Sequence, residues 1–216
     1  MEQLLNLLRK KYPLKEQSVD PYREVKASGM RFTIRAYEAE GLGHVSVMHA
    51  VGFLGLMKMD SLIINPTAKD LPLYSYDRIF AMGNDTLIVE IYDTLIAPSD
   101  FSGVEKVKQS YSDLPDHVLG AHWYDSIKLP ISVSKKAKKN LSGRFSEFAE
   151  KHLAALLEIE PDHACDAAAK REKASVYVEG LLKNGGPSTD VFLKALGQEK
   201  TEWVFRSALF GSIQSH

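Results

Sequence analysis

The sequence has a single cysteine, Cys165, among its 216 residues. One cysteine excludes an intramolecular disulfide, a Cys-x-x-Cys redox pair, a cysteine-rich zinc site and a four-cysteine iron–sulfur cluster. Long apolar runs are also lacking, because none approaches the ~20 residues of a transmembrane helix. The leucine-rich start runs into basic residues and is typical of an amphipathic helix, not of a secretion signal. We therefore expect a cytoplasmic protein of a reducing compartment with no membrane partner.

A strong excess of charge of either sign is absent as well. The chain has 27 Lys and Arg against 28 Asp and Glu, a formal net charge of -1. This balance does not predict a nucleic-acid partner, so any electrostatic partner must meet a local patch. Apolar residues make up 44% and charged residues 25%, which excludes a disordered or fibrous chain. With no internal repeat or low-complexity linker, residues 1–216 are predicted to form a single domain.

The sequence also lacks intact cofactor-binding motifs. GLGHVS at 41–46 has no third glycine and runs into a strand where a dinucleotide loop needs a helix. NGGPST at 184–189 has no phosphate-loop lysine and is better interpreted as a helix stop and restart. His44 and His49, five residues apart, fall on opposite faces of a strand. No resident metal or nucleotide is therefore expected.

The first half of the chain alternates apolar and polar residues with the period of two that is typical of half-buried strands. Short links between these strands predict an antiparallel sheet, because a parallel sheet would need crossover helices. Later, apolar residues recur at spacings of three and four, which predicts helices. The order predicts an α+β fold, with mainly C-terminal helices laid on an antiparallel sheet. Strands are expected at 31–37, 44–51, 58–64, 76–82, 86–92 and 121–133, and helices at 141–159, 164–182, 188–196 and after 197.

Two aspartates lie inside apolar strand segments, Asp60 in MKMDSLII and Asp77 in YSYDRIF. An ionised carboxylate is costly to bury unpaired, so each either faces solvent or lies in a pocket. The solvent interpretation suits Asp60 better than Asp77. In a pocket, burial would raise the pKa of the carboxyl and make it a proton donor near neutral pH. An enzyme that reduces its substrate with few cofactors needs a side chain that donates protons in this way.

Four lysines lie within five positions, at Lys135, Lys136, Lys138 and Lys139. In a nearly neutral chain they make a local positive field, which speeds encounter with an acidic partner. The alternative is a solvated loop that precedes a helix. We predict a docking surface for an acidic electron-transfer protein at these lysines.

The segment LPLYSYD at 71–77, with Thr86 in the following strand, resembles the ferredoxin-dependent bilin reductases. Their corresponding stretch reads Pro-Leu-Phe-Gly-x-Asp. The likeness covers roughly residues 30–95 and 145–214. It extends to INP at 64–66, the helix end LLKNGG, VFLKALG at 191–197 and ALFGSI at 208–213.

The resemblance implies an antiparallel β-sheet sandwiched between α-helices, with a linear tetrapyrrole, biliverdin or a close relative, bound between the sheet and the C-terminal helices. It implies that electrons come one at a time from reduced ferredoxin (or flavodoxin), with no permanently bound cofactor and no metal. Protons must then come from side chains. Two alternatives stay open: a tetrapyrrole-binding protein without reductase activity, and a reductase of another open-chain tetrapyrrole such as a chlorophyll catabolite.

The resemblance also implies roles for individual residues. Asp77 matches the catalytic aspartate, and Thr86 matches a hydroxyl that contacts a substrate propionate. A second position of the family, on a strand before the catalytic aspartate, is histidine in some members and asparagine or aspartate in others. It falls on Asp60 or Ser61, depending on a one-residue gap, and Asp60 is favoured because it can donate a proton. In the Ser61 register, His49 takes a pocket position held by glutamate in one subgroup. We predict that His49 and Asp60 tune where the proton goes.

One departure from the family concerns the loop after Asn184. Several members have an aspartate there, where this chain has Gly185 and Gly186. Asp190 is the nearest replacement and is a candidate substrate-binding residue, although its position also suits an ordinary residue of a first helical turn. The departure leaves open which double bond is reduced.

Overall fold

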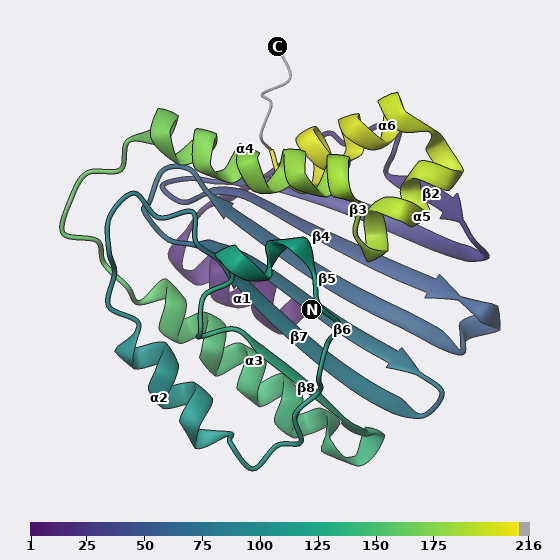
Figure 1. The fold of residues 1–216 in the computed structure, drawn as a ribbon, viewed down its shortest axis with the longest axis horizontal. Coiled ribbons are helices and arrows are strands. Elements are labelled where there is room, and N and C mark those ends of the chain that lie inside the picture. Colours follow the sequence, from purple (N-terminus) through teal and green to yellow (C-terminus); the bar gives the residue numbers. More distant parts are fainter. Residues whose placement is uncertain (212–216) are drawn as a thin grey trace.

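The computed structural model describes residues 1–211, apart from the side chains of Lys139 and Pro187. One antiparallel sheet of eight strands runs through this part of the chain, and helices cover both of its faces (Figure 1). The predicted α+β sandwich is therefore confirmed. The strands are β1 (Leu14–Gln17), β2 (Glu24–Ala27), β3 (Met30–Ala39), β4 (Gly43–Gly52), β5 (Met57–Pro66), β6 (Leu73–Ala81), β7 (Asn84–Tyr92) and β8 (Val133–Lys138).

The strands follow one another in space as β1-β3-β4-β5-β6-β7-β8, and β2 also pairs with β3. The central strands β3 to β7 match the predicted ones, because each is long enough to show its alternation. β1 and β2 were missed, since four residues carry little periodicity. The last strand was misplaced: most of 121–133 is a short helical turn and loop, and the strand begins at Val133 and contains Lys135, Lys136 and Lys138.

Six helices of the described residues form the two outer layers. The first three lie on one face of the sheet and the last three on the other (Figure 1). None of the helices in residues 1–211 is long and apolar enough to cross a membrane. The helices are α1 (Glu2–Lys11), α2 (Ser102–Ser110), α3 (Ser142–Leu157), α4 (Ala167–Asn184), α5 (Pro187–Leu196) and α6 (Gln198–Trp203), which continues into a π-helical turn, Val204–Leu209.

The sheet separates two hydrophobic cores. Leu62 and Ile64 of β5 face the core under α1, α2 and α3, whereas Ile63 faces the core under α4, α5 and α6. This alternation follows from the pleat of a strand, which points successive side chains to opposite faces. A shift of one residue therefore decides which layer a side chain of β5 or β6 meets.

Three polar side chains of the sheet hold the π-helical turn against it. His44 Nε2 donates to the Ala208 carbonyl over 3.0 Å, Ser46 Oγ donates to the Leu209 carbonyl, and Asn65 Nδ2 donates to that of Phe210, the last two over 2.7 Å. Burial lowers the pKa of His44 to about 4, so the ring is neutral at pH 7. These contacts fix the C-terminal layer over the sheet.

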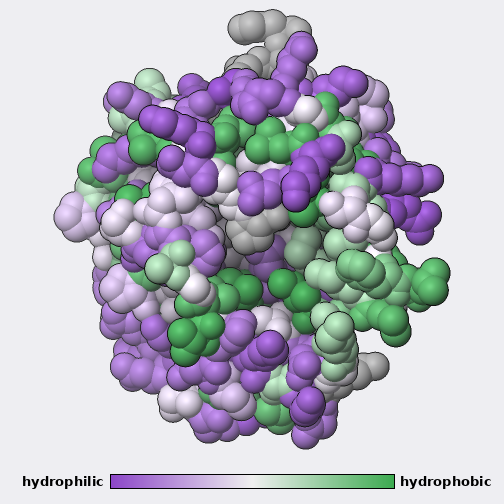
Figure 2. All heavy atoms as spheres, turned by 45° about the vertical axis from the view of Figure 1, so that its right-hand side comes forward, coloured by the Kyte–Doolittle hydropathy of each residue, from purple (hydrophilic) through white to green (hydrophobic). Residues whose placement is uncertain are grey.

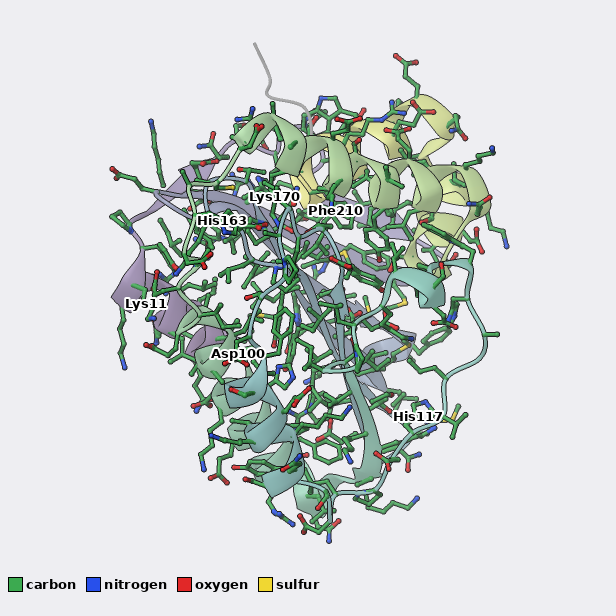
Figure 3. The ribbon with its side chains drawn as sticks, turned by 60° about the vertical axis from the view of Figure 1, so that its left-hand side comes forward. Lys11, Asp100, His117, His163, Lys170 and Phe210 are labelled. Carbon is green, nitrogen blue, oxygen red and sulfur yellow. The ribbon has the colours of Figure 1, made fainter. Side chains whose placement is uncertain are left out.

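A buried ion pair fixes the start of the same layer. Lys170 of α4 is fully buried, and its Nζ lies 2.9 Å from Asp70 Oδ1 and donates to the carbonyls of Leu71 and Thr94. His163 lies beside it, with Nε2 2.9 Å from Asp70 Oδ2 (Figure 3). Because both buried charges are paired and hydrogen-bonded, we interpret this cluster as structural.

Candidate functional site

A cavity of about 340 Å³ lies between the sheet and the C-terminal layer. Its floor comes from β4 to β7, its roof from α4, the start of α5 and the π-helical turn, and one side from the loop at 119–124. The volume falls within the range of small-molecule sites. Most of the lining is apolar, with a few polar groups that include Ser61, Ser75, Asp77, Glu90, His122 and Ser188.

Asp77 projects from the middle of β6 into this cavity. The pKa of its carboxyl is raised to about 6: burial is the main cause, a hydrogen bond from Ser61 Oγ opposes the rise, and the negative charge of Glu90 adds to it. A carboxyl with this pKa is partly protonated near neutral pH. It can therefore give a proton to a bound ligand.

Ser61, not Asp60, is the neighbour of Asp77 on β5. The β5–β6 register places Ser61 directly opposite Asp77, and Asp60 opposite Arg78. The cavity-facing row across β4, β5, β6 and β7 is Met48, Ser61, Asp77 and Ile88. The preference for Asp60 at this position is therefore wrong, because Ser61 is the residue of β5 that faces the cavity beside Asp77.

His49 and Asp60 lie on the other face of the sheet. They stand opposite each other in the β4–β5 register, and His49 Nδ1 is 2.6 Å from Asp60 Oδ1. Each is one residue away from a cavity-facing position, and the flanking Val47 and Leu62 belong to the core under α1 and α3. The prediction that His49 and Asp60 share the pocket with Asp77 is therefore wrong, because the pleat turns them away.

Thr86 and Asp190 lie at different distances from the cavity wall. Thr86 is buried and pairs with Ile79 on the cavity side of the sheet, but it does not itself line the cavity. Asp190 is exposed in the first turn of α5 and lies against Gly185, while Ser188 and Thr189 of that turn reach the cavity. The geometry thus favours the ordinary helix-turn interpretation of Asp190.

Glu90 is a cavity residue that the sequence analysis missed. Its carboxylate accepts a hydrogen bond from Tyr92 over 2.6 Å, and Lys128 Nζ lies 3.3 Å from its other oxygen. A signal was present, because TLIVEIY carries one charged residue inside an apolar strand, as the segment around Asp77 does. Glu90 follows Ile88 by two positions, so the same alternation places both on the cavity face.

Aromatic side chains form one wall of the site: His122, Tyr124 and Tyr177 line the cavity, and Tyr92 is buried against the two tyrosines. Tyr92 of β7 stacks on Tyr177 of α4 with ring centroids 4.1 Å apart, and Tyr124 meets both rings edge-on. His122 stacks on Tyr124 at 4.8 Å. Burial raises the pKa of Tyr177 well above its ordinary value, so its hydroxyl stays neutral. The wall offers flat, polarisable surface to a conjugated ligand.

The four lysines do not form one surface. Lys135 is buried on the α3 side, where its Nζ donates to the Leu114 carbonyl over 2.9 Å and lies 2.6 Å from Asp116. The prediction that it helps to dock a partner is therefore wrong, because alternation along β8 turns it inward. Lys136 and Lys138 are exposed on the other side of this edge strand. The Lys139 side chain lies outside the described residues.

The architecture places the chain in a structural class: an antiparallel sheet between two helical layers, with a cavity under the C-terminal one. Among solved structures, phytochromobilin synthase from tomato, in complex with biliverdin, matches 98% of this chain and 82% of its own, with a TM-score of 0.70 and 15% identity. That protein is a ferredoxin-dependent bilin reductase, so the resemblance is confirmed in the fold. No family model matches the chain, and no curated protein matches its sequence.

Proposed function

We propose that this protein reduces a linear tetrapyrrole, biliverdin or a close relative, with Asp77 as a proton donor. The observation that carries the proposal is the position of Asp77, a carboxyl with a pKa of about 6 inside a cavity between sheet and helices. The fold is that of an enzyme crystallised with biliverdin, which supports this class of ligand. The aromatic side chains of His122, Tyr124 and Tyr177, which line the cavity, suit a conjugated pigment.

The proposed reaction adds two electrons and two protons to each double bond that is reduced. Asp77 gives one of these protons and becomes a carboxylate, which the Ser61 hydroxyl then stabilises by its hydrogen bond. Exchange with solvent restores the acid, which then gives the second proton. Glu90, held by Tyr92 and Lys128, keeps negative charge near Asp77 and so favours its protonated form before the next transfer.

The electrons are proposed to come one at a time from reduced ferredoxin, or from flavodoxin, without a permanently bound cofactor. An acidic donor would meet the exposed Lys136 and Lys138 on the edge strand, beside Thr86 on the cavity side of the sheet. Small, largely electrostatic contacts are typical of transient electron-transfer complexes.

The experiment is to mix the purified protein with biliverdin and record absorption spectra before and after anaerobic addition of a ferredoxin reducing system. We expect a bound-pigment spectrum that then changes as double bonds are lost. If the spectrum of the bound pigment did not change on addition of reduced ferredoxin or flavodoxin, the protein would be a tetrapyrrole-binding protein without reductase activity. Absence of any binding to biliverdin, with binding of an open-chain chlorophyll catabolite, would move the substrate to that class.

A further inference from the structure

Large apolar side chains are exposed at one end of the sheet. They stand on two turns, the β4–β5 turn with Phe53, Leu54 and Leu56, and the β6–β7 turn with Met82. Leu54 and Met82 are 105% and 92% exposed. Figure 2 shows this apolar cluster projecting from the surface beside a hollow. The two turns are neighbours, because β5 pairs with β6 up to Met57 and Ala81.

The backbone at these tips is of a kind that bulky residues rarely adopt. Phe53, Leu54 and Met82 have positive φ angles of 51°, 56° and 51°. Glycine and asparagine take this left-handed region more easily, and Asn-Gly is the preferred pair for a tight hairpin such as Met82–Gly83. The apolar side chains therefore do not stabilise the turn conformation. Because they are exposed, they do not contribute to the hydrophobic core either.

Two hollows beside the tips are lined by positively charged side chains. Lys26 and Arg31 line the one beside the β4–β5 turn, and Lys58 lines the one between this turn and the β6–β7 turn. No carboxylate lines either hollow within residues 1–211. The end of the sheet thus combines projecting apolar tips with basic groups set behind them.

We propose that this end of the sheet, defined by Phe53, Leu54, Leu56, Met82 and the three cations, docks on an anionic phospholipid surface. Apolar side chains that enter the boundary between headgroups and acyl chains, with cations at headgroup level, are the features of a peripheral membrane contact. The tips are convex and separate, which a fluid bilayer accommodates directly. A protein partner would instead need matching pits over about 800 Å² per side.

The contact would hold the cavity next to the lipid surface. Met59 and Ile79 line the cavity and lie two residues from the ends of β5 and β6 that carry the tips. An amphiphilic ligand could pass between surface and cavity over a short path. This consequence rests on geometry alone and does not require the proposed reductase activity.

The test uses sedimentation with vesicles of phosphatidylcholine alone and of phosphatidylcholine with phosphatidylglycerol. We expect binding to the anionic vesicles only, weakened by salt. The variant Leu54→Asn/Met82→Asn should bind at least about tenfold more weakly, because it removes two large apolar groups. Asparagine suits positive φ, so this variant should melt at the same or a higher temperature, which separates lost docking from damaged folding.

The matched control is Val176→Gln, which changes an exposed apolar residue on α4 and should leave vesicle binding unchanged. Equal binding of wild type and the double variant, or no binding to anionic vesicles at low salt, would overturn the proposal. So would concentration-dependent self-association that the double variant abolishes in the absence of vesicle binding. None of these outcomes depends on whether biliverdin is reduced.

Discussion

Ser61 donates a hydrogen bond to the carboxylate of Asp77 from the directly opposite position on the neighbouring strand. The hydrogen bond favours the ionised carboxylate, whereas burial and the charge of Glu90 favour the protonated acid. The balance leaves a pKa of about 6, so both forms are accessible near neutral pH. A group that donates a proton and recovers it in each cycle needs this property.

The first prediction concerns stability. The pKa of Asp77 is raised from 3.8 to about 6 in the fold, so its stabilising contribution is present below pH 4 and lost as the pH rises through 6. Asp77→Asn cannot ionise and should therefore be more stable than wild type by about 3 kcal/mol at pH 8. The difference should close towards pH 4. Denaturant unfolding between pH 4.5 and 8 measures it, and parallel pH profiles would contradict the buried carboxyl.

The second prediction concerns Ser61. Ser61→Ala removes the hydrogen bond that lowers the pKa of Asp77, so this pKa should rise. The alkaline limb of the bilin reduction rate should then move to higher pH, as followed in single-turnover absorption. Ser75→Ala is the matched control, since Ser75 lines the cavity on the same face of β6. Equal shifts in the two variants would show that the hydrogen bond has no part in tuning Asp77.

The third prediction has the opposite sign. Glu90→Gln removes a negative charge that raises the pKa of Asp77, so the pKa should fall and the alkaline limb should move to lower pH. The glutamine keeps the size of the side chain and can still accept from Tyr92. A profile that stays in place, with only a general loss of rate, would assign Glu90 to packing alone.

The fourth prediction tests the corrected position of His49 and Asp60. Both lie on the face opposite the cavity, so His49→Ala and Asp60→Asn should change biliverdin affinity and turnover by less than about twofold. As a surface pair they should contribute at most about 1 kcal/mol to stability. A large loss of rate in either variant, with stability intact, would return these residues to the mechanism.

The fifth prediction divides the lysines. Replacing Lys136 and Lys138 with glutamate should slow ferredoxin-driven turnover most at low ionic strength, with unchanged biliverdin affinity. Lys135→Met should instead destabilise the protein by about 1–3 kcal/mol, because it leaves the Leu114 carbonyl unpaired. Equal turnover of the glutamate variant and wild type across a salt series would rule out docking at Lys136 and Lys138.

The sequence was sufficient for the fold class and for the central strands β3 to β7, because strands of nine or ten residues display their alternation over several periods. It also located Asp77, since a carboxylate stands out in an apolar strand. It could not decide between Asp60 and Ser61, because a shift of one residue reverses the face and pairing register is a tertiary property. For the same reason, Lys135 was grouped with Lys136 and Lys138.

Contacts distant in sequence were beyond the reach of pattern analysis. The role assigned to Glu90 depends on its contact with Lys128, 38 residues away, and on its effect on the pKa of Asp77 on the same face. The aromatic cluster of Tyr92, Tyr124 and Tyr177 joins β7, α4 and the segment before β8, which no local spacing relates. Exposure of the apolar tips was also hidden, because Leu54 and Met82 look like core residues in a sequence.

The measurement that tests the central claim most directly is anaerobic single-turnover reduction of bound biliverdin by reduced ferredoxin, in wild type and Asp77→Asn. Both proteins should bind the pigment with similar affinity. In the wild type the absorption of bound biliverdin should then decrease as the pigment is reduced. In the variant the rate of this decrease should be lower by about a hundred- to ten-thousandfold. Turnover of the variant at the wild-type rate would contradict the assignment of Asp77 as proton donor.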